Sequence, residues 1–195
     1  MAKQKKTGKS QPGRLRIVAG NWRSRLLDVA DVPGLRPTSQ RIRETLFNWL
    51  ATRLPGTRCL DLFAGTGALG LEALSRGARE VVFVERAALA VATLERNTAA
   101  LEAVGAFVLQ MDAATYLARD HEAGFDIVFL DPPFGDDRLE ELCRLLEQQH
   151  VLAPDALVYL EQDKSKPEVE LPHGWRTLKN KTAGNVRYML VQATH

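Results

Sequence analysis

The segment Asp61-Leu-Phe-Ala-Gly-Thr-Gly-Ala-Leu-Gly70 decides the fold. The apolar run Cys59–Phe63 predicts a short strand, and Ala68–Arg76 predicts a helix that Gly77 ends. A glycine-rich turn between a strand and a helix lets the backbone approach a ligand closely. Three glycines of the segment have the spacing G-x-G-x-x-G, which is typical of dinucleotide binding, so the segment predicts a cofactor site.

Strands and helices alternate beyond this segment. We predict strands at 81–84, 106–110, 126–130 and 156–160, and helices at 87–102, 113–118 and 137–148. This alternation indicates an α/β fold, a doubly wound and mostly parallel sheet with helices on both faces. The end of the chain differs, because Trp175–Asn180 and Val186–Val191 flank Thr182-Ala-Gly-Asn185, which predicts an antiparallel hairpin. A hairpin at this place is unlike the usual dinucleotide fold.

The residues before the sheet form a separate part. We expect 1–13 to be a disordered basic tail, 14–57 an appendage, and 58–195 the ligand-binding domain. Leu15 to Val18 and Leu26 to Val29 bracket Gly20-Asn21 and predict two short strands, and a helix capped by Thr38 or Ser39 follows.

The charge of the chain is unevenly distributed. Residues 1–58 hold 13 Lys and Arg against 3 acids, a net charge of +10, whereas the other 137 residues hold 13 against 21, a net charge of −8. A basic end on an acidic body favours a polyanionic partner. The arginines alternate with apolar residues, so we expect an RNA-binding surface made by Arg16, Arg23, Arg25, Arg36, Arg41 and Arg43.

Carboxylates follow three of the predicted strands. Glu85 lies 20 residues after Gly65, where an acid that binds a ribose belongs. Asp61 would repel a pyrophosphate but suits a cofactor with a positively charged amino acid part, although a turn aspartate is an alternative. Asp112 either accepts from an adenine amino group or caps the next helix. The full set expected at the cofactor is Asp61, Phe63, Ala64, Gly65, Thr66, Gly67, Glu85, Arg86, Asp112 and Ala113.

The sequence Asp131-Pro132-Pro133-Phe134 ends the predicted fourth strand of the sheet. Ligands bind at this carboxyl edge in open α/β sheets. The prolines donate no N–H group, so nearby carbonyls and the Asp131 carboxylate remain as rigid acceptors for a substrate amine. Phe134 offers a stacking face for a heterocyclic base. We therefore predict that these four residues form the catalytic base pocket.

These motifs resemble those of the bacterial RsmD family. Asp131–Phe134 is similar to the [Asn/Asp/Ser]-Pro-Pro-[Tyr/Phe] motif of amino-methyltransferases, and Asp61–Gly67 to the cofactor motif of class I methyltransferases. The more specific likeness is the N-terminal pattern, in which Arg14–Leu27, Gly34–Thr38 and Arg41–Trp49 are similar to RsmD sequences. The resemblance runs from about Arg14 to Val191.

The resemblance implies a Rossmann-like, seven-stranded sheet whose last two strands form the hairpin. It also implies a 16S rRNA (guanine-N2)-methyltransferase that uses S-adenosylmethionine on the small ribosomal subunit or its assembly intermediate. In that case Asp61, Phe63, Gly65 and Gly67 hold the methionine end, Glu85 the ribose, and Asp112 the adenine of the cofactor. The target base must lie outside a helical stack to be reached.

Several alternatives remain open on the residues alone. A DNA or RNA adenine-N6 methyltransferase shares the four-residue motif, a protein glutamine methyltransferase prefers Asn at position 131, and an oxidoreductase shares the glycine loop. A non-catalytic RNA-binding assembly factor would keep only the basic part. We expect no metal, because the four histidines lack ligand spacing, and no membrane span. Two distant cysteines favour a cytoplasmic protein, which we expect to be a monomer.

Overall fold

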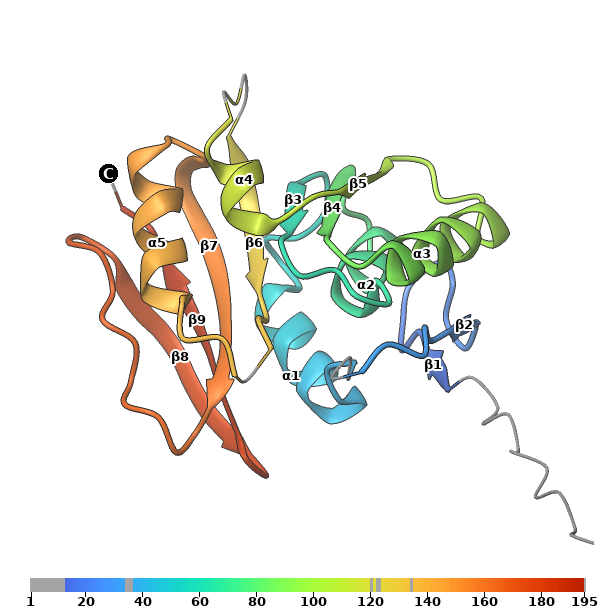
Figure 1. Cartoon of the computed structure of the whole chain (residues 1–195), viewed down its shortest axis with the longest axis horizontal. Coiled ribbons are helices and arrows are strands. Elements are labelled where there is room, and N and C mark those ends of the chain that lie inside the picture. Colours follow the sequence, from blue (N-terminus) through green and yellow to red (C-terminus); the bar gives the residue numbers. More distant parts are fainter. Residues whose placement is uncertain (1–12, 34–36, 120, 122–123, 134, 195) are drawn as a thin grey trace, which may run out of the picture.

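The computed structural model describes residues 13–33, 37–119, 121, 124–133 and 135–194. Its centre is a seven-stranded sheet with the strand order β5-β4-β3-β6-β7-β9-β8 (Figure 1). Strands β3 to β7 run parallel to their neighbours, and β9 pairs antiparallel with both β7 and β8. The strands are β3 Arg58–Asp61, β4 Glu80–Glu85, β5 Ala106–Gln110, β6 Phe125–Leu130, β7 Leu152–Asp163, β8 Arg176–Ala183 and β9 Val186–Gln192. The expected doubly wound sheet with a terminal hairpin is confirmed.

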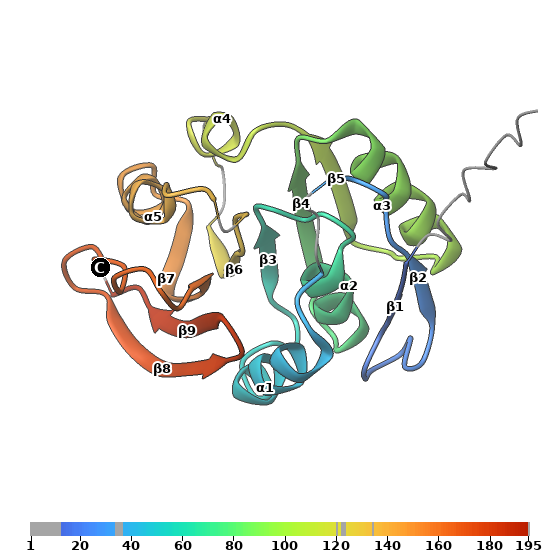
Figure 2. The same ribbon diagram turned by 60° about the horizontal axis from the view of Figure 1, so that its bottom comes forward.

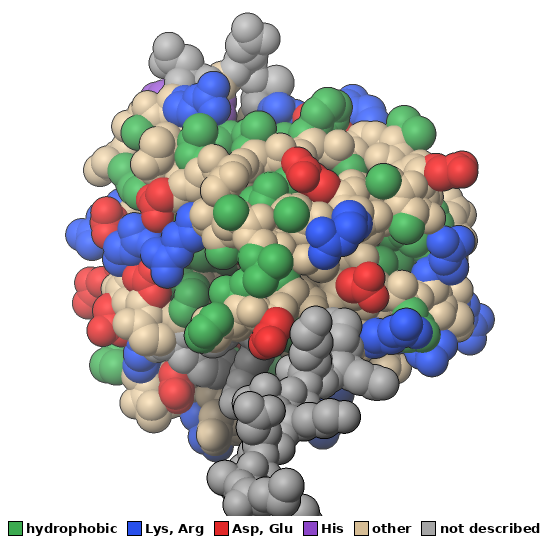
Figure 3. All heavy atoms as spheres, turned by 45° about the vertical axis from the view of Figure 1, so that its right-hand side comes forward, with side chains coloured by type: hydrophobic (Ala, Val, Ile, Leu, Met, Phe, Trp, Pro, Cys, Tyr) green, Lys and Arg blue, Asp and Glu red, His purple; other side chains and the backbone are tan. Residues whose placement is uncertain are grey.

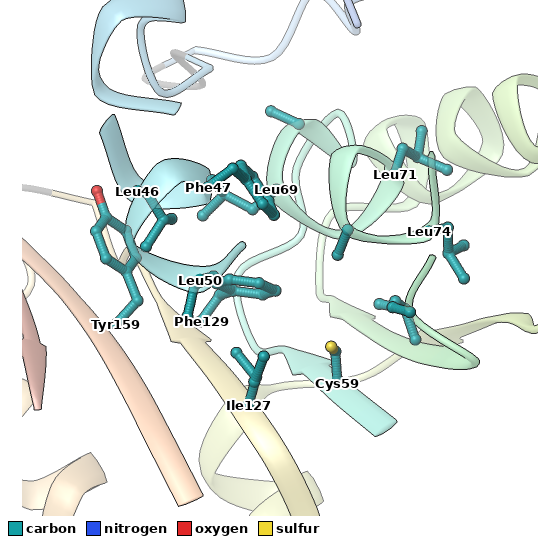
Figure 4. Packing of buried hydrophobic residues seen from close by; sticks show 14 of the residues in the cluster. Leu46, Phe47, Leu50, Cys59, Leu69, Leu71, Leu74, Ile127, Phe129 and Tyr159 are labelled. Atoms are coloured by element: carbon teal, nitrogen blue, oxygen red, sulfur yellow. The ribbon is translucent and has the colours of Figure 1, made fainter. Parts of the chain in front are cut away.

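In the part of the chain that the structure describes, five helices cover the two faces of this sheet (Figure 2). The helices are α1 Gln40–Leu50, α2 Ala68–Ser75, α3 Ala88–Ala100, α4 Ala113–Leu117 and α5 Leu139–Gln148. One apolar cluster joins α1, α2 and α3 to the sheet, and a second joins α4 and α5 to its other face. Figure 4 shows the first cluster where Phe47 and Leu50 of α1 pack beside Phe129 of β6. Residues of α1 are therefore held over the carboxyl end of β6.

The N-terminal part forms a small two-stranded sheet of β1 (Arg14–Arg16) and β2 (Leu26–Asp28). The loop between them is bonded to the last turn of α2, because Asn21 donates to the Ser75 carbonyl at 2.7 Å. A Cβ on Gly20 would lie 1.8 Å from that carbonyl oxygen, so only glycine allows this approach. The tip of this part therefore lies at the end of α2 that is far from the glycine loop.

The structure corrects the expected position of Arg43. We expected this side chain on an exposed RNA-binding face, but it is 1% exposed and forms an ion pair with Glu72 of α2 at 3.2 Å. It also donates to the carbonyls of Thr38 and Arg16. The Glu72 carboxylate accepts in addition from the N–H groups of Val18 and Ala19. Arg43 thus joins α1, α2 and the N-terminal part, and its guanidinium is turned away from the surface.

Two strands extend beyond their predicted ends. β7 begins at Leu152 instead of Ala156, where Pro154 and Asp155 made a strand improbable from the sequence. Asp155 has a φ of 57°, and the pairing with β6 shifts register between Phe125 and Ile127. β8 continues to Ala183, so the expected four-residue turn is only Gly184-Asn185. β8 therefore reaches the edge at which β6 ends, whereas the residues added at the start of β7 lie at the opposite edge, where Leu152 pairs with Phe125.

Candidate active site

One carboxylate lies at or close to the carboxyl end of each of five adjacent strands of the sheet. In the order β5, β4, β3, β6 and β7, these are Asp112, Glu85, Asp61, Asp131 and Glu161. The sequence predicted the first four, and the parallel register brings them to one edge. It missed Glu161, whose signal is its position directly after Leu160, just as Asp131 follows Leu130. Leu130 and Leu160 are register partners, which places the two carboxyl groups on neighbouring strands.

The glycine loop between β3 and α2 is shaped for close approach. Gly67 has a φ of 80°, and a Cβ there would meet the side chain of Leu94 at 2.5 Å. Glu85 accepts hydrogen bonds from the N–H groups of Gly65 at 2.9 Å and Ala87 at 2.8 Å. These hydrogen bonds link the loop to the end of β4. Because Glu85 is only half-buried, its carboxylate remains open to a ligand.

Asp61 lies beneath this loop with only 2% of its surface exposed. Its carboxylate accepts from the Gly70 N–H at 3.1 Å and from the N–H of Phe63. Burial, together with the charges of Asp131 and Glu85, raises the pKa of Asp61 to about 7. Asp61 therefore also acts as the turn aspartate that the sequence offered as an alternative, because it accepts from backbone N–H groups of the glycine segment. A positive charge above the loop would offset the cost of ionising this buried group.

The other residues expected at the cofactor surround the same loop. Ala64, Thr66 and Ala113 are buried, Phe63 is half-buried and Arg86 is exposed. Asp112 caps α4 by accepting from Ala114 N at 2.9 Å, and its other oxygen lies 3.7 Å from Arg138. The side chain of Asp112 is 36% exposed, so capping and ligand contact are compatible.

Asp131 is anchored by a residue that comes before α1. Thr38 Oγ1 donates to Asp131 Oδ2 at 2.7 Å, and Ser39, one of the two predicted caps, accepts from the N–H of Ile42. Burial raises the pKa of Asp131 to about 6, against the hydrogen bond from Thr38, which lowers it. Pro132 is buried and Pro133 is exposed, whereas Phe134 lies outside the described residues. Thr38 was predicted only as a possible cap, so its role here was missed.

The arginines expected to bind RNA differ in exposure. Arg16, Arg23, Arg25 and Arg41 are exposed, Arg43 is buried, and Arg36 lies outside the described residues. Arg25 donates to the carbonyl of Ala100 at the end of α3. Lys and Arg side chains on the face shown in Figure 3 are scattered among acidic ones.

Within the described part of the chain, no group of His, Cys, Asp and Glu is arranged to hold a metal ion. The described helices include none that is both long and apolar enough to cross a membrane.

The strand order, the glycine loop and the terminal antiparallel pair define a Rossmann-like class I methyltransferase fold. A family model described as "Conserved hypothetical protein 95" matches residues 15–192. The chain is 45% identical over 188 residues to ribosomal RNA small subunit methyltransferase D of Escherichia coli, covering 96% of this chain and 94% of that one. The protein of that name from Haemophilus influenzae is 43% identical over 183 residues, covering 92% and 94%.

A solved structure supports the same assignment. The protein yhhF from Escherichia coli matches with a TM-score of 0.88 and 42% identity, covering 94% of this chain and 99% of that one. The chain belongs to the RsmD family.

Proposed function

We propose that this protein transfers a methyl group from S-adenosylmethionine to the exocyclic 2-amino group of a guanine in 16S rRNA of the small ribosomal subunit. The observation that carries this proposal is Asp131, a half-buried acceptor fixed by Thr38 at the end of β6 and followed by two prolines. The names of the relatives support ribosomal RNA as the substrate.

The row of carboxylates fits S-adenosylmethionine better than a pyrophosphate cofactor. In that molecule the methionine end, with its sulfonium and ammonium, would face Asp61, the ribose diol would face Glu85, and the adenine amine would face Asp112. Each of these groups is cationic or donates hydrogen bonds. A pyrophosphate would meet the buried carboxyl of Asp61, whose pKa is already raised by burial and nearby negative charge. When bound, S-adenosylmethionine supplies a methyl group on a positively charged sulfur.

The residues of the base pocket then act on the substrate amine. A guanine amine is a weak nucleophile because its lone pair is delocalised into the ring. Hydrogen bonds from its two N–H groups to the Asp131 carboxylate and the Pro132 carbonyl favour a pyramidal nitrogen with an exposed lone pair. As the amine nitrogen bonds to the methyl carbon, the bond between that carbon and the sulfonium sulfur would break and leave a neutral thioether, and the nitrogen would lose one proton to Asp131. Positioning and electrostatics thus supply the rate, without a covalent enzyme intermediate.

The proposal is tested by incubating the protein with labelled S-adenosylmethionine and small subunits that lack the modification, followed by digestion and nucleoside analysis. We expect label in N2-methylguanosine alone. Label in N6-methyladenosine would favour the adenine-specific alternative. Particle binding without label in any nucleoside would favour a non-catalytic assembly factor.

A further inference from the structure

Glu161 occupies the position on β7 that Asp131 occupies on β6. Leu130 and Leu160 are paired in the parallel register, and each acid is the next residue. Side chains alternate between the faces of a sheet, so Glu161 lies on the same face as Tyr159, two residues earlier. That face carries the cluster in which Phe129 and Tyr159 pack against α1 (Figure 4). Asp131, two residues after Phe129, is on the same face, where Thr38, which precedes α1, donates to it.

The burial of Glu161 requires an explanation. The residue is 4% exposed, and one of its carboxylate oxygens, Oε2, accepts from the Tyr159 hydroxyl at 2.6 Å. Burying a carboxyl beside another one is costly, and a hydrophobic residue would pack the sheet more cheaply. Glu161 also borders a cavity together with Pro132 and Pro133, the residues that follow Asp131. A buried carboxyl at the border of this cavity is a candidate ligand-binding group.

We infer that Glu161 is a specificity residue that accepts the ring N1–H of the target guanine while Asp131 accepts the N2–H. This inference rests on the proposed function and deepens it. Guanine presents N1–H and N2–H as adjacent donors on one edge, and two carboxylates on neighbouring strands form a matching pair of acceptors. Adenine has an unprotonated N1, which an ionised Glu161 repels. The pair would therefore select guanine from the amino-bearing purines.

The protonation of the pair follows from its surroundings. Burial and the charge of Asp131 raise the pKa of Glu161 to about 8, while the Tyr159 hydroxyl lowers it. Near neutral pH and without substrate, Asp131 and Glu161 accordingly hold one proton between them, mainly on Glu161. Glu161 must lose this proton before it can accept the N1–H of guanine. Other titratable and charged groups on nearby strands or around the cavity include Asp61, Tyr188, Arg187, Lys181, Asp136, Asp137, Glu140, Asp163 and Lys166.

The test compares two bases at the target position of 16S rRNA assembled with small-subunit proteins. One RNA carries guanosine, and the other carries 2-aminopurine, which keeps the 2-amino group but lacks the N1–H. We expect the preference of the wild type for guanosine to fall by about 10- to 100-fold in Glu161→Gln, because the amide can donate to an unprotonated N1. The missing O6 of 2-aminopurine affects both proteins alike, so the change in preference reports on N1.

A pH profile gives a second readout. For the wild type, kcat/KM on guanosine should rise between pH 7 and 8.5 as Glu161 ionises, and the Glu161→Gln profile should be flat there. Tyr159→Phe removes the donor to Glu161, so the rise should move to higher pH with the preference for guanosine retained. Glu168→Gln, on the exposed segment after β7, is the matched control and should behave as the wild type.

Two outcomes would overturn the inference. One is an unchanged preference in folded Glu161→Gln, and the other is an equal loss on both RNAs with an unchanged pH profile, which indicates a purely structural role. If Glu161→Gln does not fold, the pH profile of Tyr159→Phe decides. A rise in kcat/KM at the same pH as in the wild type overturns the inference, and a rise shifted to higher pH supports it. A wild type that never forms N2-methylguanosine would refute the proposed function itself, which is a separate result.

Discussion

At the scale of single residues, the carboxyl groups at the edge of the sheet differ in burial and in hydrogen-bond partners, and these differences separate their proposed roles. Asp61 is held under the glycine loop with a pKa raised to about 7, and Asp131 is held by Thr38 with a pKa of about 6. Glu85 instead bonds two backbone N–H groups and stays half-exposed. The sequence identified these acids because each follows an apolar run or a known motif. Glu161 belongs to no motif, and the family-like stretch Gly34–Thr38 gives Thr38 no contact with Asp131, so only the folded chain shows the place of these two residues beside Asp131.

Thr38→Val should make methyl transfer more dependent on pH. The hydroxyl of Thr38 stabilises the ionised form of Asp131, so its loss raises the pKa of Asp131 above about 6. More of the carboxyl is then protonated at pH 6.5, and transfer should slow by roughly 3- to 10-fold there and much less at pH 8.5. Rates at saturating substrate over this range are the measurement, with Thr45→Val on α1 as the control. A uniform slowing at all pH values would contradict this role of Thr38.

Glu85→Ala should weaken cofactor binding without unfolding the protein. The carboxylate is assigned to the ribose hydroxyls, and losing hydrogen bonds to a charged group should raise the Kd by about 10- to 100-fold. Calorimetric titration with S-adenosylmethionine measures this, and Glu95→Ala on the exposed side of α3 is the control. Unchanged affinity in a folded variant would remove Glu85 from the cofactor site.

At the scale of elements, the N-terminal part is anchored more firmly than its sequence suggests. The apolar residues Ile42, Leu46, Phe47, Trp49 and Leu50 recur with helical periodicity and predict the apolar face of α1, and all of them except the half-buried Trp49 are buried. The same periodicity did not predict the burial of Arg43, because its partner Glu72 lies on α2, a contact made only in the folded chain. Long-range ion pairs of this kind leave no local signal in the sequence.

Arg43→Met should therefore destabilise the fold instead of weakening RNA binding directly. Removing one partner of a buried ion pair costs about 3–5 kcal/mol, because the other charge remains buried. Thermal unfolding should show a Tm lowered by roughly 10 °C. Arg41→Met, on the exposed side of α1, is the matched control and should leave the Tm within about 2 °C of the wild type. A normal Tm in Arg43→Met would contradict the structural role.

Replacing Arg23 and Arg25 with Ala tests the remaining RNA-binding proposal. If both contact phosphates, binding to small subunits should weaken, and the slope of log affinity against log salt should fall by about 1 for each. The Tm and the cofactor affinity should stay nearly constant. The control is the double variant Arg119→Ala, Arg144→Ala on the other helix layer, in which subunit binding, salt slope, Tm and cofactor affinity should all stay nearly constant.

A lowered Tm with an unchanged salt slope would show that Arg23 and Arg25 are structural. The loop that carries them is bonded to the last turn of α2, about 12 Å along that helix from the glycine loop. RNA contacts would then have to be sought on the hairpin of β8 and β9, with Lys179, Lys181 and Arg187. Tyr188 of β9 is the register partner both of Glu161 on β7 and of Lys181 on β8, so the three residues lie side by side across these strands.

At the scale of the whole molecule, the order of elements and the place of the site could be predicted because both depend on local patterns. Apolar runs gave the strands, and the rule that ligands bind at the carboxyl edge placed the site. The extra length of β7 could not be predicted, because Asp155 adopts a positive φ that its residue type disfavours. How α1 closes over β6 could not be predicted either, since it depends on packing between residues distant in sequence, such as Phe47 and Phe129.

The most direct test of the central claim compares the wild type with Asp131→Asn on small subunits that lack the modification, using labelled S-adenosylmethionine. The account predicts N2-methylguanosine from the wild type and a loss of at least about 100-fold in Asp131→Asn. The two proteins should bind the cofactor with affinities that agree within a few-fold. Near-normal formation of N2-methylguanosine by Asp131→Asn would contradict the assignment of Asp131 to the substrate amine.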